Sequence, residues 1–274
     1  MTMPGPMAKS EAGVKTVADA RPGRFSFLQG GFSLNPMIHA VESDQVTASH
    51  RADFEAKAEA ILAGGARGFG ELAALHFSFG PDHPYEEVPP DHPLLLLLSD
   101  LAAKHDVPID LHMELVAQDK PTPQRLRTIS PQNPAELKEN LAAFERLLSH
   151  NASARFTWVH VGFDNTGDMT PARVGTLLAA HPNLYLGVRI PTKPTPTYPQ
   201  NSVLDGTGTL RAPWRDVLEA HPDRFLLGSD GFYADDATEV DAQLAEMVKF
   251  LNQVPASAVA QVARENAAAV YGLG

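Results

Sequence analysis

Residues Thr170–Ile190 read TPARVGTLLAAHPNLYLGVRI and contain one complete helix–turn–strand unit. Thr170 followed by Pro171 is typical of a helix start, because threonine caps the first turn and proline suits its first position. His181–Pro182 interrupts the helix, and the largely apolar run Asn183–Ile190 is typical of a strand buried on both faces of a parallel sheet. The stretch therefore predicts a helix that leads through a short turn into a strand.

The same unit recurs along the chain. Six β-rich runs alternate with helical stretches: Arg24–Gln29, Arg67–Leu75, Val107–Leu115, Arg155–Val161, Asn183–Ile190 and Arg224–Asp230. Strands that alternate with helices form parallel sheets through right-handed crossovers. The pattern predicts an α/β fold of six parallel strands, each followed by a helix, in one domain.

A further helix start is predicted at Asn133, with Pro134 in the first helical position and Glu136 completing a capping box. Its apolar face is marked by Leu137, Leu141, Phe144 and Leu148.

Loop lengths predict where a ligand would bind. The connections from helix to strand are short, whereas three connections from strand to helix are long: His76–His92, Val116–Gln132 and Pro191–Leu210. Long loops therefore gather at the carboxyl ends of the strands, where barrels and open α/β sheets bind ligands. The first of these loops carries His76, His83 and His92, which either form a lid or are simply exposed to solvent.

Charge and composition exclude several classes of protein. The chain of 274 residues has 22 basic and 33 acidic residues and no cysteine. A net charge of −11 argues against a nucleic-acid partner, and the absence of cysteine excludes disulfides and thiolate metal sites. The longest apolar run, Leu94–Leu98, is too short to span a membrane, and Met1–Gly23 lacks the pattern of a signal peptide. We expect a cytoplasmic protein that acts on a small molecule.

Four ionisable residues lie within or at the ends of four different predicted strands. They are Glu71, His112, His160 and Asp230. A charge buried in a strand is costly unless it is paired or bound to metal. Imidazoles together with carboxylates suit zinc or a similar divalent ion. The pattern predicts a metal site, although a lone histidine in an apolar strand is also typical of a hydrogen-bonded core.

Two further residues are candidates for substrate binding. Glu114 shares one side of its predicted strand with Asp110 and His112, because side chains two residues apart point the same way. Arg189 ends another strand, and its planar guanidinium suits a substrate carboxylate. For Glu114 and for Arg189, a structural ion pair is an equal alternative to substrate binding.

The chain resembles the amidohydrolase superfamily, in its amidohydrolase-related branch. The resemblance covers roughly Arg24 to Gly274 and is most specific in Leu226-Leu227-Gly228-Ser229-Asp230 and in Glu265–Leu273, which contains Asn-Ala-x-x-x-Tyr-Gly. It implies a (β/α)8 TIM barrel. It also implies metal-binding roles for His112 and His160, a metal ligand and general base in Asp230, and a bridging ligand in Glu71.

The chain departs from this family at its beginning. The family carries a His-x-His pair on its first strand, and this sequence contains none. A βαβ unit takes about 30 residues or more, so the residues before Arg24 are too few for two strands with their helices. We expect an irregular N-terminal segment over residues 1–23, then an amidohydrolase-like barrel domain over 24–274 that lacks its first two units. Unpaired strand edges in such a barrel favour self-association into a homo-oligomer.

The function that follows is that of a metal-dependent hydrolase of the amidohydrolase type, acting on a small organic substrate. Zinc or another divalent ion would activate water, Asp230 would accept its proton, and His160 would steady the developing oxyanion. Two alternatives stay open: a catalytically impaired barrel that binds a ligand or partner, and a decarboxylase on the same scaffold.

Overall fold

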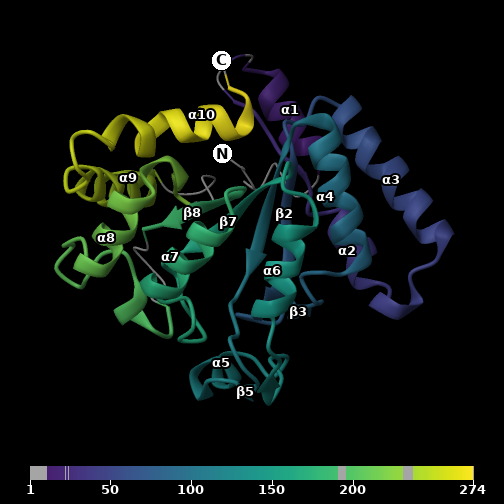
Figure 1. Cartoon of the computed structure of the whole chain (residues 1–274), viewed down its shortest axis with the longest axis horizontal. Coiled ribbons are helices and arrows are strands. Elements are labelled where there is room, and N and C mark those ends of the chain that lie inside the picture. Colours follow the sequence, from purple (N-terminus) through teal and green to yellow (C-terminus); the bar gives the residue numbers. More distant parts are fainter. Residues whose placement is uncertain (1–10, 22, 24, 191–195, 231–236, 274) are drawn as a thin grey trace.

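Six parallel strands form the centre of the computed structural model, which describes residues 11–21, 23, 25–190, 196–230 and 237–273 (Figure 1). Their order in the sheet follows their order in the chain: β1 (Gln29–Gly30), β2 (Phe69–His76), β4 (Pro108–Met113), β7 (Arg155–Val161), β8 (Leu184–Arg189) and β9 (Phe225–Gly228). Because neighbouring strands run parallel, their carboxyl ends lie at one edge of the sheet.

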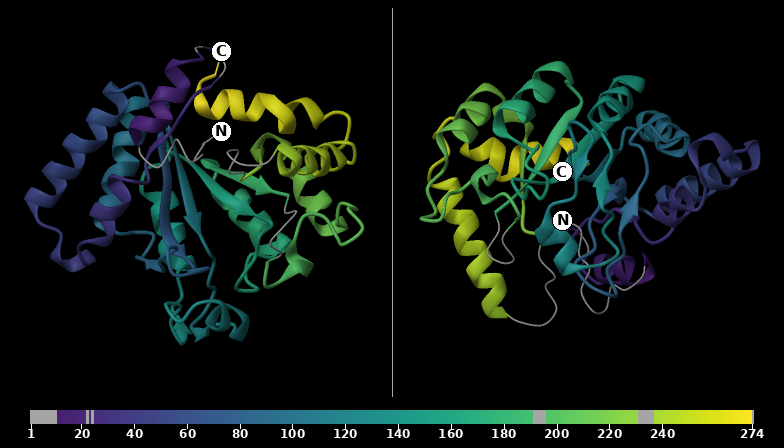
Figure 2. Two further views of the ribbon diagram at one scale, coloured as in Figure 1. Left: turned by 180° about the vertical axis from the view of Figure 1, so that it is seen from behind. Right: turned by 90° about the horizontal axis from the view of Figure 1, so that it is seen from below.

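The helices lie around the sheet, most of them on its outer side and the C-terminal one near the amino ends of the strands (Figure 1, Figure 2). They are α1 (Glu11–Asp19), α2 (Leu34–His39), α3 (Ala48–Ala63), α4 (Pro93–His105), α5 (Gln124–Ile129), α6 (Leu141–His150), α7 (Pro171–Ala180), α8 (Ala212–Ala220), α9 (Ala237–Leu251) and α10 (Asn266–Tyr271). Short 3-10 turns occupy Ser43–Gln45, Pro199–Asn201 and Pro222–Arg224, and a π-helical turn, Gln261–Glu265, leads into α10.

The parallel α/β architecture is confirmed, with one strand displaced. Five of the six β-rich runs cover observed strands, except that β2 extends one residue past its run, to His76. The first run is wrong in its bounds, because residues 25–28 form no strand and β1 begins at Gln29. Two small antiparallel pairs were not predicted: β3 (Glu86–Glu87) joins the end of β2, and β5 (Lys120–Pro121) pairs with β6 (Glu136–Leu137). β3 and β5 lie in two of the predicted long loops, and β6 follows the second of these loops.

The helices pack on the sheet through large apolar side chains. Trp158 of β7 is fully buried, and its ring meets that of Phe144 on α6 with centroids 5.3 Å apart. Alternation along β7 therefore directs Trp158 toward the helical layer. Burial of such aromatic side chains contributes on the order of 2–3 kcal/mol each.

The two predicted helix starts had opposite outcomes. Thr170 caps α7 as expected, its hydroxyl accepting a hydrogen bond from the backbone N–H of Arg173. The predicted start at Asn133 is wrong, because α6 begins at Leu141. The Asn133 side chain instead bonds the backbone N–H and carbonyl of Ser78, 55 residues away in sequence. This long-range partner displaces the local cap.

The pairing of the parallel strands begins at β1 and ends at β9. Within the described residues, β9 does not pair with β1. The described part of residues 11–23 contains no strand, but it does contain α1, where we expected irregular structure; residues 1–10 of that segment lie outside the described part. No helix in the described chain combines the length and apolar character needed to cross a membrane.

Candidate metal centre

Three of the four predicted metal residues, His112, His160 and Asp230, lie at or just after the carboxyl ends of their strands, whereas Glu71 is the third residue of β2. Glu71 lies on β2, His112 on β4, His160 on β7, and Asp230 follows β9. Their strands are neighbours in the sheet except that β8 separates β7 from β9. Arg189 occupies that intervening position as the last residue of β8. The fold thus brings the candidates together.

Two strand irregularities aim Glu71 and His160 at the centre. The register between β2 and β4 shifts between Phe69 and Leu72, at Glu71. The register between β7 and β8 shifts between Val159 and Val161, and the intervening His160 has a positive φ of 63°. Strict alternation would point His160 to the same side as Trp158, toward the helices. The irregular backbone turns it to the opposite side, since bulges re-aim side chains.

Three ligand atoms converge as a metal ion would require. Glu71 Oε1 lies 2.8 Å from His112 Nδ1 and 3.0 Å from His160 Nε2. All three atoms lie within 4.8 Å of one another, close enough to share one ion. Two imidazole nitrogens and one carboxylate oxygen form a donor set typical of zinc. The residues present therefore fit a divalent metal ion.

The charges within the centre are strongly coupled. Burial disfavours the charged form of Glu71, but the charge on His160 and the hydrogen bonds from both imidazoles outweigh it and hold the pKa of Glu71 well below its usual value. Burial also disfavours the charged form of His160, yet Glu71 and Asp230 raise its pKa to about 9. Burial lowers the pKa of His112. Glu71 is thus an ionised carboxylate that is hydrogen-bonded to both histidines.

Asp230 lies between this centre and a guanidinium. Its Oδ1 is 4.0 Å from His160 Nε2, and its Oδ2 is 2.8 Å from Arg189 Nη1. Asp230 also has a positive φ of 49°, which sets the direction of its side chain at the end of β9. Arg189 therefore forms a structural ion pair, which was one of the two roles that the sequence predicted for it.

Glu114 is buried beside the centre but is held by another residue. Its carboxylate accepts a hydrogen bond from Asn165 Nδ2 at 2.7 Å, and burial raises its pKa to about 8. Asp110, on β4, accepts a hydrogen bond from the hydroxyl of Tyr271 on α10 at 2.8 Å. The assignment of Glu114 to substrate binding stays a prediction.

Sequence reasoning missed two contacts of the centre. His76, the last residue of β2, places its ring edge-on to His112 with centroids 4.6 Å apart, and His83 lies 4.4 Å beyond His76. His76 follows an irregularity in the pairing of β2 with β4, and the sequence alone does not reveal that irregularity. His92, by contrast, is fully buried as the cap of α4, so solvent exposure is the wrong interpretation for it.

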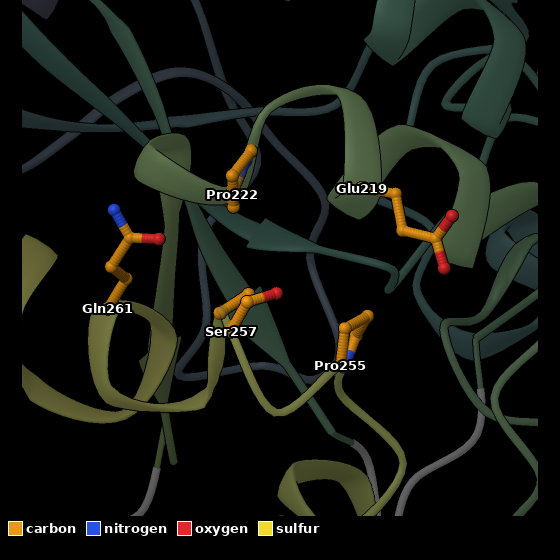
Figure 3. A pocket seen from close by; sticks show the side chains of 6 residues that line it. Glu219, Pro222, Pro255, Ser257 and Gln261 are labelled. Carbon is orange, nitrogen blue, oxygen red and sulfur yellow. The ribbon is translucent and has the colours of Figure 1, made fainter.

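The backbone directly after β1 passes close to Glu71, because a Cβ atom at Gly31 would lie 2.8 Å from the Glu71 carbonyl oxygen. A pocket of about 390 Å³ lies elsewhere, lined by Glu219, Pro222, Pro255, Ser257, Ala258 and Gln261 (Figure 3). Pro222 precedes β9 whereas Asp230 follows it, so this pocket lies toward the amino end of that strand.

The fold and the centre together define an α/β protein with a candidate metal site at the carboxyl ends of its parallel strands. A family model described as Amidohydrolase matches residues 45–273, and the chain belongs to this family. No curated protein matches the chain.

Solved structures that are similar to this chain have low sequence identity to it. The crystal structure of 2,6-dihydroxybenzoate decarboxylase complexed with 2,6-dihydroxybenzoate is 15% identical, with a TM-score of 0.51 over 94% of this chain and 74% of that chain. Amidohydrolase 2 from Bifidobacterium longum subsp. infantis is 10% identical, with a TM-score of 0.40 over 80% and 76% of the two chains. An amidohydrolase from Burkholderia multivorans with bound zinc is 15% identical, with a TM-score of 0.41 over 89% and 88%.

Proposed function

We propose that this protein is a metal-dependent hydrolase that acts on a small organic substrate. The observation that carries the proposal is the convergence of Glu71 Oε1, His112 Nδ1 and His160 Nε2 from three separate strands. These residues would hold a divalent ion, with zinc favoured by the donor set, and Asp230 stands near enough to take part. A bound divalent ion supplies positive charge that lowers the pKa of water and polarises a substrate oxygen.

The residues around the ion have separate tasks in this proposal. Asp230 Oδ1 would accept the proton of the attacking water, because it is a carboxylate oxygen that faces the centre. His160 would also face the negative charge that develops on the substrate. Glu71 Oε1 hydrogen-bonds both imidazole nitrogens in this structure, and the same three atoms would turn to the ion, in place of those bonds, when it is bound.

A second candidate is a barrel that binds a ligand without turnover. The ion pair between Arg189 and Asp230 favours it, because that pair engages the proposed proton acceptor. A decarboxylase on the same scaffold is a third outcome, separable from hydrolysis by its carbon dioxide product. A cytoplasmic location and self-association remain predictions.

The experiment combines metal analysis with activity. We expect purified protein supplied with zinc to retain about one ion per chain, and His112→Ala to lose it. His221→Ala is the matched control, since His221 lies between α8 and β9, away from the centre. Asp230→Asn should keep the fold but abolish hydrolysis of a panel of lactones, esters and amides. Wild-type protein that retains no divalent ion would refute the proposal, and an ion without any turnover would favour the second candidate.

A further inference from the structure

Arg189 is a buried cation held between two different kinds of partner. Its guanidinium carbon lies 4.1 Å above the ring of Phe163, and its Nη1 is paired with Asp230. Its side chain is 16% exposed. The Nε atom is buried and has no hydrogen-bond partner within the described chain. The guanidinium therefore carries a buried N–H whose hydrogen bond is unmade in this structure.

Asp230 is the only side chain of the described residues that pairs with Arg189. The same carboxylate lies 4.0 Å from His160 Nε2, so it is within reach of an ion held by Glu71, His112 and His160. A divalent ion in that position would compete with Arg189 for Asp230, because its charge is larger and more concentrated. A poorly exposed guanidinium whose partner is withdrawn needs another anion.

We propose that Arg189 binds a carboxylate group of the substrate, and that metal loading makes it available by drawing Asp230 away. This inference rests on the proposed metal-dependent function and names its substrate class as organic carboxylates. It also predicts that metal and carboxylate strengthen each other's binding, because linkage between two binding sites is reciprocal.

The chemistry of the surroundings favours a carboxylate over a phosphate. A guanidinium offers a planar fork of donors that matches the two oxygens of a carboxylate. The Phe163 ring lies against the face of that fork, which leaves its edges for hydrogen bonds. The carboxylates of Glu71 and Asp230 place negative charge in the same region, and a phosphate dianion would be repelled more strongly than a singly charged carboxylate.

The test measures binding rather than turnover, with benzoate as the probe. Calorimetric titration of benzoate is performed on wild-type protein that is zinc-loaded and on protein treated with a chelator. We expect zinc to tighten benzoate binding about 10-fold or more, within the usual range of coupling between sites. Benzoate should tighten zinc binding by the same factor. Benzamide, which has a similar shape and no charge, should show no such dependence.

Variants separate the role of Arg189 from that of the metal. Arg189→Met should remove the zinc-dependent gain in benzoate affinity. Arg189→Lys keeps the charge without the fork, so it should retain only part of that gain and provides a second test if the methionine variant is unstable. Arg215→Met is the matched control, because Arg215 is exposed on α8 and should leave the gain unchanged.

The possible results distinguish this inference from the proposed function. Zinc that binds without strengthening benzoate binding would overturn the role of Arg189 and leave the metal site standing. An undiminished gain in Arg189→Met would do the same. Failure of wild-type protein to bind zinc would overturn both proposals.

Discussion

Asn266 offers a direct test of how the C-terminal helix supports the sheet. It is the first residue of α10, and its buried side-chain amide donates hydrogen bonds to the carbonyl oxygens of Pro222 and Phe225, at 2.8 and 2.9 Å. These bonds join α10 to the start of β9, the strand that ends near Asp230. We expect Asn266→Ala to destabilise the fold.

The magnitude follows from these two bonds. Each hydrogen bond contributes about 1 kcal/mol net, and each carbonyl left buried and unpaired adds a penalty on the order of 1 kcal/mol. Alanine regains about 0.5 kcal/mol through its higher helix propensity. The free energy of unfolding should therefore fall by about 2–4 kcal/mol, and the melting temperature by roughly 5–10 °C.

Urea unfolding followed by tryptophan fluorescence measures this change, since Trp158 and Trp214 are both fully buried. Asn252→Ala is the control: Asn252 is exposed after α9, and its loss should cost less than about 0.5 kcal/mol. Asn266→Asp keeps the side-chain volume but removes the donor, so it should also be destabilising. An Asn266→Ala protein within 0.5 kcal/mol of wild type would refute this account of α10.

Three further predictions test other parts of the fold. Burial lowers the pKa of His92, and its neutral Nδ1 accepts a hydrogen bond from the N–H of Leu94. The neutral ring therefore stabilises α4 fully above pH 6.5, and this stabilisation is lost as the pH falls. Urea unfolding should show a smaller loss between pH 7 and 5 in His92→Asn, and equal losses would contradict the reasoning. Gly31→Ala should weaken zinc binding measured by calorimetry, because its side chain would meet the carbonyl of Glu71; unchanged affinity would count against this close approach. Thr170→Ala removes the cap of α7 and should lower the free energy of unfolding by about 1 kcal/mol, whereas Thr170→Ser should retain most of it.

Local patterns in the sequence determined the architecture. Apolar runs of strand length between helical stretches specify strands buried on both faces, and this property depends on neighbouring residues alone. Thr170 and Pro171 likewise define a helix start without help from the rest of the chain. The resemblance to amidohydrolases, carried largely by the Gly228-Ser229-Asp230 strand end and the C-terminal Asn266–Gly272 segment, indicated the family that the comparison with family models confirms.

The tertiary structure alone decided how the candidate residues face one another. His160 reaches Glu71 because the register between β7 and β8 shifts at Val159–Val161, and that shift depends on a strand formed by a later segment of the chain. The pairing of Arg189 with Asp230 has the same origin, since it joins the ends of two separate strands.

The two errors in interpreting polar residues have a related cause. The Asn133 side chain hydrogen-bonds the backbone of Ser78 rather than capping a helix. His92 is buried as the cap of α4 rather than exposed in a loop. A polar side chain takes whichever partner lowers its free energy most once water is excluded, and burial is a property of the assembled fold. Sequence therefore specified which residues could form the centre, while long-range register and burial determined which atoms meet there.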